Sequence, residues 1–169
     1  MARQDGLALM EALLIEHPDD VALMADGHSL SRRALHRSAS ALAAHWLELG
    51  LRRGDCIALW LPNGLAWMQV VFAAARSGLL VIPISTRYKP PEVRHLLEVS
   101  RARAIIVPRH FLEADFVAIA QQLQAGLATL EWVLVHEQAD QLMPPEASGQ
   151  PGDHEGGAGE GVQLEVFKR

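Results

Sequence analysis

Short apolar segments alternate with helix-like segments along residues 1–138, and this alternation restricts the fold more than any other feature. Segments 56–61, 79–84, 104–107 and 132–135 are almost wholly apolar. Such runs are typical of strands that are covered on both faces, as in parallel sheets. Parallel neighbours need a long crossover between them, usually a helix. The pattern therefore predicts an α/β fold with a doubly wound, mainly parallel sheet flanked by helices.

A β-hairpin is expected before the first helix. Residues 21–25 and 28–30 read as two short strands joined by an Asp-Gly pair, which is a strong hairpin signal. Ser31 can then cap a helix that carries one apolar stripe. Gly50 is expected to end that helix, because a glycine readily takes the left-handed conformation just past a helix.

Three further helices are expected between the apolar segments. Asn63 is a favourable N-cap for a helix over 64–77. A helix over 90–100 opens on two consecutive prolines, which suit the first helical turn. A last helix is predicted over 113–125, where the apolar residues fall on one face.

The chain changes character after residue 138. Segment 139–169 is acidic and rich in glycine and proline, so it buries little, and we expect disorder from about 140 to 161. Residues 162–166 alternate apolar and polar side chains and form either a short strand or no regular structure. We therefore predict an α/β subdomain over 1–138 and a mostly disordered acidic tail over 139–169.

Composition excludes several classes of protein. The net charge of −5 argues against general nucleic-acid binding, which needs a basic face. The most apolar window, 66–84, contains an arginine and a proline and does not predict a membrane span. The first residues lack the apolar core of a signal peptide, so a cytoplasmic location is expected. With one cysteine, Cys56, neither an internal disulfide nor a cysteine-rich zinc site is expected.

Few side chains are arranged as a catalytic or metal site. Eight histidines occur, but no two lie three or four positions apart, so we expect surface or half-buried side chains and no metal site. Cys56 begins an apolar strand and is expected to be a packed core thiol rather than a nucleophile. The histidines are His17, His28, His36, His45, His95, His110, His136 and His154.

Arg87 and Tyr88 form the most informative polar pair. They follow segment 79–84, at the carboxyl end of a predicted strand, where open α/β sheets bind ligands. Arg87 could therefore shape a substrate or nucleotide cleft. The interpretation we favour is a loop that braces one helix against its neighbour through hydrogen bonds.

The remaining aromatic and basic side chains are expected to be structural. Tryptophans in apolar strands and helices are expected in the core rather than in binding platforms. The arginines that follow turns and helix ends are expected to be solvated. These side chains are Trp46, Trp60, Trp67, Arg52, Arg53, Arg101 and Arg103.

Three consecutive segments together resemble one known family. They are LELGLRRGDCIALWLPN at 47–63, AAARSGLLVIPI at 73–84 and STRYKPPE at 85–92. Their order and spacing resemble the N-terminal part of the AMP-forming acyl-CoA synthetases, within the adenylate-forming superfamily. The likeness extends over about 17–136. It departs at Leu30-Ser31-Arg32, where the family often has Thr-Tyr.

The resemblance implies a two-step ligase reaction. A carboxylic acid attacks the α-phosphate of ATP to give an acyl-adenylate and pyrophosphate, and coenzyme A then displaces AMP to give a thioester. ATP, Mg²⁺ and coenzyme A are thus implied for the full-length family. The family uses a Gly/Ser/Thr-rich phosphate loop that ends in lysine, an acidic Mg²⁺ ligand, an acidic residue on the ribose and a late catalytic lysine.

These catalytic elements are not found in this sequence. The glycine-rich run 156–161 carries no Ser, Thr or Lys, is bordered by Glu155 and includes Glu160, so it is expected to be a linker. The two lysines, Lys89 and Lys168, match no catalytic position of the family. We therefore assign no catalytic, cofactor-binding or metal-binding residue to this chain, and we expect it to bind no cofactor on its own.

Three functions remain open. The chain is expected to be the N-terminal fragment of an ATP-dependent ligase that joins a fatty or aromatic acid to coenzyme A, and to be inactive alone. Its partner is then the remainder of the synthetase or a separate C-terminal chain. The alternative is a non-catalytic interaction module that pairs with itself or with another chain through an exposed synthetase-like face. The third is an unrelated doubly wound domain that binds a small ligand.

Overall fold

A five-stranded sheet forms the centre of the computed structural model, which describes residues 12, 16–136 and 164–169. Its strand order is β4-β3-β5-β8-β9. The first four strands run parallel, and β9 pairs antiparallel with β8. The strands are β3 (Cys56–Leu59), β4 (Leu80–Pro83), β5 (Ala104–Val107), β8 (Trp132–His136) and β9 (Leu164–Lys168).

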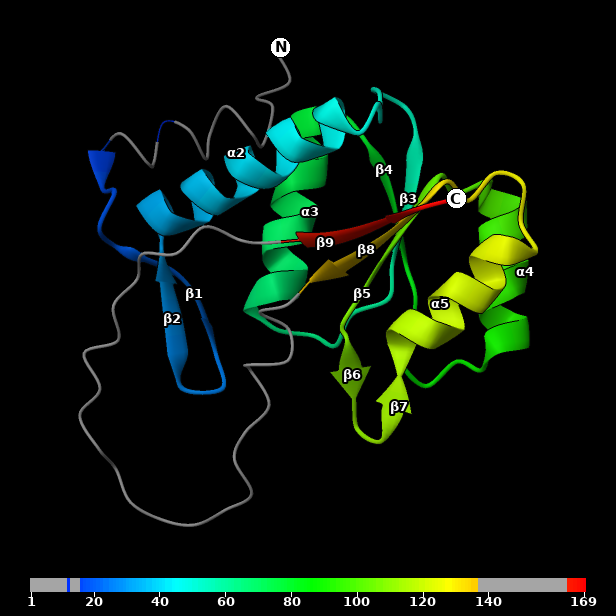
Figure 1. Ribbon diagram of the computed structural model, residues 1–169. Coiled ribbons are helices and arrows are strands. Elements are labelled where there is room, and N and C mark those ends of the chain that lie inside the picture. The colour runs from blue at the N-terminus through cyan, green and yellow to red at the C-terminus, as the bar shows by residue number, and fades with distance from the viewer. Residues whose placement is uncertain (1–11, 13–15, 137–163) are drawn as a thin grey trace.

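Helices cover both faces of this sheet (Figure 1). Alternate strand residues such as Ile57 and Ile106 pack with α2 (Arg32–Glu48) and α3 (Leu65–Ser77) on one face. The intervening residues pack with α4 (Pro90–Ser100) and α5 (Phe116–Ala125) on the other. Two apolar clusters with a buried sheet between them confirm the doubly wound α/β fold.

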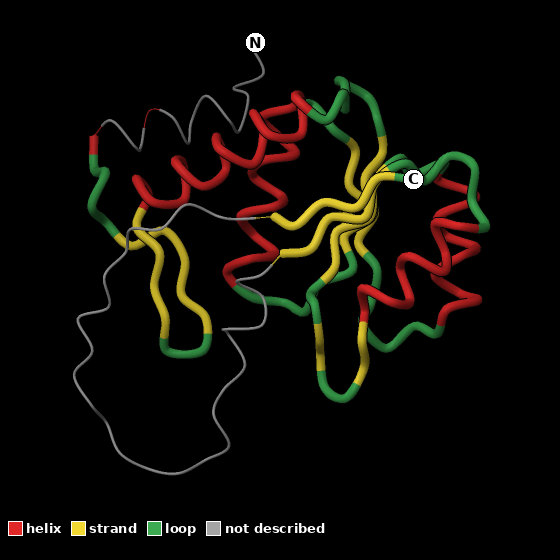
Figure 2. Tube along the Cα trace, in the orientation of Figure 1, coloured by secondary structure: helices red, strands yellow, loops and turns green. Residues whose placement is uncertain are grey.

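The N-terminal hairpin stands apart from the central sheet, as Figure 2 shows. Strands β1 (Val21–Ala25) and β2 (His28–Ser31) pair antiparallel through a turn at Asp26 and Gly27. Both turn residues have positive φ, 51° and 78°, as a tight hairpin turn requires. The Ser31 hydroxyl accepts a hydrogen bond from the Ala34 N–H at 3.2 Å, which confirms the expected cap of α2.

Two predicted helix starts were wrong. The N-cap of α3 is Gly64, which makes no side-chain hydrogen bond, whereas Asn63 was the expected cap. The last predicted helix, 113–125, begins only at Phe116, because the Asp115 carboxylate accepts a hydrogen bond from the Ala118 N–H. Before it, β6 (His110–Phe111) and β7 (Ala114–Asp115) form a small antiparallel hairpin that the apolar pattern did not predict.

Strand β4 differs from the buried strand that was expected at 79–84. In the described sheet it has one neighbour, β3, and therefore lies at an edge. Leu80, the first residue of β4, is accordingly 59% exposed, whereas Leu79 and Ile84, which flank the strand, are buried. An apolar run alone does not distinguish a central strand from an edge strand.

The tail enters the fold at one described place. Residues 164–168 form β9 at the edge of the sheet beyond β8. The expected disordered segment, 140–161, and the expected boundary at 138 lie outside the described residues. Within the described part of the chain, no helix is long and apolar enough to cross a membrane.

Candidate functional site

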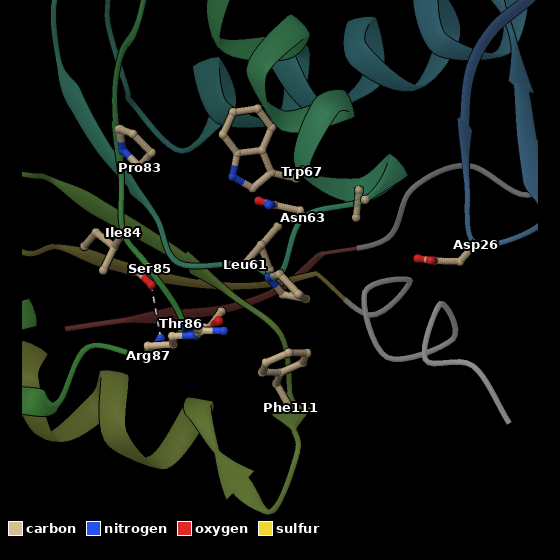
Figure 3. A pocket seen from close by; sticks show the side chains of 13 residues that line it. Asp26, Leu61, Asn63, Trp67, Pro83, Ile84, Ser85, Thr86, Arg87 and Phe111 are labelled. Carbon is tan, nitrogen blue, oxygen red and sulfur yellow. Dashed lines mark hydrogen bonds between the residues drawn. The ribbon is translucent and has the colours of Figure 1, made fainter. Parts of the chain in front are cut away.

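A pocket of about 680 Å³ lies at the carboxyl ends of the parallel strands. Its walls come from residues 61–64 after β3, the first turn of α3, and residues 83–87 at the end of β4. Phe111 of β6 and Asp26 at the turn of the N-terminal hairpin complete the lining (Figure 3). Segments far apart in the sequence therefore meet at one opening.

The strand order explains why an opening forms there. The chain moves from β3 outward to β4 and then returns to β5 on the other side of β3. Loops that leave β3 and β5 consequently diverge above the sheet. A reversal of this kind is where open α/β sheets bind ligands, outside the carboxyl ends of the strands.

Two aromatic side chains, Trp67 and Phe111, contribute to the apolar wall. Trp67 was expected in the core, but it is half-buried and borders the pocket, because it lies on the first turn of α3. Trp46 and Trp60 are fully buried, as expected. The Trp60 indole N–H donates to the Ser85 carbonyl at 3.0 Å, which ties the loop after β4 to the core.

Arg87 lies exposed at the opening of this pocket (Figure 3). Its backbone N–H donates to the Ser85 hydroxyl at 3.3 Å. Its guanidinium makes no hydrogen bond or ion pair with the described part of the chain, so Arg87 does not brace a helix as favoured from the sequence. Tyr88, its predicted companion, is exposed and does not line the pocket.

The lining defines what the pocket can accommodate. Among the described residues, Arg87 and Asp26 are the charged ones that line it, and the other lining side chains are apolar or uncharged. One arginine can pair with a single anionic group. A nucleoside triphosphate needs several donors and a metal ion, whereas the described lining offers one cationic side chain, Arg87, and one carboxylate, Asp26.

An ion-pair cluster occupies the opposite, amino ends of the strands. Arg103 was expected to be solvated, but its guanidinium donates to Asp55 at 2.5 Å and to both carboxylate oxygens of Glu131 at 2.9 and 2.7 Å. The hydrogen bond from Arg103 lowers the pKa of Glu131, and the bond to Glu131 raises the pKa of Arg103. Because these residues precede β5, β3 and β8, the cluster joins three strands.

His136 departs from the expectation of exposed or half-buried histidines. It ends β8 and is fully buried, and neither ring nitrogen has a hydrogen-bond partner among the residues that the structure describes. Desolvation by burial lowers the pKa of His136 to about 4. His17, His28, His95 and His110 are exposed, and His36 and His45 are half-buried, whereas His154 lies outside the described residues.

The other candidate residues do not form a reactive centre. Cys56 is buried at the start of β3, and burial raises the pKa of its thiol, which disfavours the thiolate. The Lys89 N–H donates to Glu92 at the start of α4, and the Lys168 ammonium lies 5.0 Å from the Trp132 ring centroid. Among the described residues, no group of three or more His, Cys, Asp or Glu side chains could hold a metal ion.

The sequence reasoning missed several residues of the pocket. Asp26 was recognised only as a turn residue, Phe111 fell before a helix predicted too early, and Trp67 was assigned to the core. Their shared signal is position, because each lies at a turn or at the first residues after a strand. The sequence does not show that the N-terminal hairpin reaches the same opening.

Comparison with known proteins identifies close counterparts for part of the chain. A sequence model described as AMP-binding enzyme matches residues 12–161. The chain is 29% identical over 131 residues to the 2,3-dihydroxybenzoate-AMP ligase of Bacillus subtilis, covering 78% of this chain and 24% of that protein. It is 33% identical over 109 residues to a long-chain-fatty-acid–CoA ligase of Salmonella typhimurium, covering 64% of this chain and 19% of that protein.

Solved structures share the fold. The anthranilate CoA ligase AuaEII, in complex with anthranoyl-AMP, aligns with a TM-score of 0.68 at 24% identity, covering 76% of this chain and 24% of that one. The coronafacic acid ligase of Pectobacterium brasiliense also aligns with a TM-score of 0.68, at 18% identity, covering 77% of this chain and 25% of that one. The chain therefore spans about a quarter of the length of these proteins.

Proposed function

This chain belongs to the AMP-binding enzyme family, and on that premise we propose that it is the N-terminal scaffold of an ATP-dependent carboxylic acid–CoA ligase. The whole protein would convert a fatty or aromatic acid to an acyl-adenylate and then to a thioester. The observation that carries this proposal is the family match over residues 12–161. The names of relatives that act on 2,3-dihydroxybenzoate and on long-chain fatty acids support both acid classes.

The part of the reaction assigned to this chain is limited to shaping a cleft. The described residues do not fit ATP, because among those that line the pocket at the carboxyl ends Arg87 is the single cation and Asp26 the single carboxylate. We therefore derive no catalytic step from them. ATP, Mg²⁺ and coenzyme A would be held by the remainder of the synthetase or by a separate C-terminal chain, with Arg87 and Trp67 forming one wall of the cleft.

We expect no ATP–pyrophosphate exchange from purified residues 1–169 with any member of a panel of fatty and aromatic acids. The reason is that the chain carries neither the phosphate loop nor the family's catalytic lysine. A full-length 2,3-dihydroxybenzoate-AMP ligase assayed in parallel serves as the positive control. Exchange above the acid-free blank would overturn the assignment of catalysis to another part of the protein.

The coding sequence past codon 169 tests the fragment proposal separately. We expect it to encode a Ser/Thr/Gly-rich loop that ends in lysine, followed by a later domain that bears a second lysine. Finding neither, in any reading frame, would contradict the proposal that this chain is part of a ligase. The search would then turn to a partner that covers its exposed surface.

A non-catalytic interaction module is the second candidate. It is favoured by exposed apolar side chains at two hairpins, with Met24 77% and Leu112 75% exposed. If these hairpins mediate association, the Met24→Ser/Leu112→Ser variant should remain monomeric at concentrations where the parent chain associates in sedimentation velocity. The Val99→Ser variant removes a comparably exposed side chain from α4 and is the matched control. Equal association of all three chains would contradict a role of these two hairpins in association.

A further inference from the structure

The outer edge of β8 has the character of an interior strand. All five residues of β8 are buried, and three consecutive apolar residues, Val133 to Val135, have no exposed surface. One side of β8 pairs with β5 and the other with β9. Without β9, an apolar strand with unpaired backbone groups would form the edge of the sheet, and such an edge readily pairs with another strand.

Specific side chains hold β9 against this edge. Glu165 forms an ion pair with Arg109, and the Lys168 ammonium lies over the Trp132 ring. The Gln124 side-chain amide donates to the Phe167 carbonyl at 3.4 Å. Phe167 also packs against the apolar cluster of α4 and α5, whereas Leu164 and Val166 pack against that of α2 and α3. The edge therefore recognises a strand with apolar side chains on both faces and an acid near its first residue.

The connection to β9 does not dictate which chain supplies it. Strands β1 and β2 are joined by a two-residue turn, which forces them to pair within one chain. Strands β8 and β9 are instead separated by residues 137–163, a sequence rich in glycine and proline. Those 27 residues could span at most about 90 Å when fully extended. A strand on such a connection can reach the β8 edge of a neighbouring copy.

We propose that the outer edge of β8 is a strand-acceptor surface and that its partner is a second copy of this chain, which inserts its own β9. Reciprocal insertion gives a closed two-fold dimer in which each copy completes the sheet of the other. The contacts that β9 makes in the dimer are the same as those described above for one chain, so they stabilise the monomer and the dimer equally. This inference does not depend on the proposed ligase function.

Site-directed disulfides distinguish insertion within a chain from insertion between chains. In a Cys56→Ala background, one chain carries Val135→Cys and a second carries Glu165→Cys, because these two positions are direct partners in the antiparallel register. Val135 has no exposed surface, so a thiol there is reached only by an inserted strand. A third chain with Ser29→Cys, at an exposed position in β2, replaces the Glu165→Cys chain as the collision control.

We expect oxidation of the mixed chains at 100 µM to yield a disulfide between position 135 of one chain and position 165 of another, identified by mass spectrometry. At an effective concentration of about 1 mM for the tethered strand, about one chain in ten is exchanged. The yield should rise with protein concentration and exceed that of the Ser29→Cys mixture roughly tenfold.

Two results would overturn the proposal. In the first, the double variant with cysteines at 135 and 165 closes within one chain while the mixed chains give no more cross-link than the control. In the second, the double variant also fails to close, which would refute the register of β9 itself. As an independent measurement on the unmodified chain, sedimentation equilibrium should detect a dimer that increases between 10 and 200 µM, and a pure monomer throughout would also contradict exchange.

Discussion

Lowering the pH from 7 to 4 should remove about 3 kcal/mol from the free energy of unfolding through His136 alone. The imidazole is fully buried, and in the described part of the chain neither nitrogen has a hydrogen-bond partner that would compensate a positive charge. Burial lowers its pKa from 6.5 to about 4. Below pH 6.5 the unfolded chain therefore binds a proton that the folded chain excludes. This contribution is complete above pH 6.5 and is lost as the pH falls towards 4.

Urea unfolding between pH 4 and pH 8 measures this effect against two variants. The His136→Phe chain keeps an apolar ring at the end of β8 but cannot titrate, so it should lose about 3 kcal/mol less than the parent chain over this range. The His95→Phe chain changes an exposed side chain of α4 and should keep the parent pH dependence. If His136→Phe and the parent lose stability in parallel, His136 is not the source of the acid sensitivity.

Replacing Arg103 with methionine should lower the free energy of unfolding by about 2 kcal/mol at pH 7. The substitution leaves Asp55 and Glu131 together without their cation at the amino ends of β3 and β8. The side chains of Arg103 and Asp55 are only 28% and 23% exposed, so water replaces the lost hydrogen bonds only in part. The loss should be smaller at pH 4, because Arg103 lowers the pKa of Glu131 and the stability gained from this pairing falls as the pH approaches that lowered pKa.

Matched variants separate this cluster from a general effect of charge. The Arg52→Met chain removes the same charge from an exposed turn and should stay within about 0.5 kcal/mol of the parent. Adding Glu131→Gln to Arg103→Met should recover part of the lost stability, since it removes one unpaired carboxylate. Equal losses from Arg52→Met and Arg103→Met in urea titrations would show that the cluster adds nothing specific.

The sequence was most informative where one local signal governs one element. The Asp-Gly turn of the hairpin, the Ser31 cap and the paired prolines of α4 were all identified correctly, because each depends on neighbours within one turn. The apolar segments likewise predicted buried strands with helices between them. These signals together were sufficient for the fold class.

Apart from the two helix starts, the errors concern features that depend on distant parts of the chain. Arg103 is held by Asp55 and Glu131, which reach it only after three strands align. The edge position of β4 follows from strand order, which apolar patterning does not encode. The pocket could not be predicted for the same reason, because its residues Trp67, Arg87 and Asp26 come from three separate segments. Periodicity describes each segment, but it does not show which segments meet.

The order of the parallel strands also governs how the chain must fold. Each parallel pair joins segments separated by at least one entire helix, and the chain between β3 and β5 contains α3, β4 and α4. Closing such long loops costs entropy before any sheet contact offsets it. Non-local pairing of this kind slows folding relative to helical bundles. Among the described strand pairs, β1–β2 and β6–β7 are the ones that join neighbouring residues, so during synthesis the apolar strands of the central sheet emerge well before their partners.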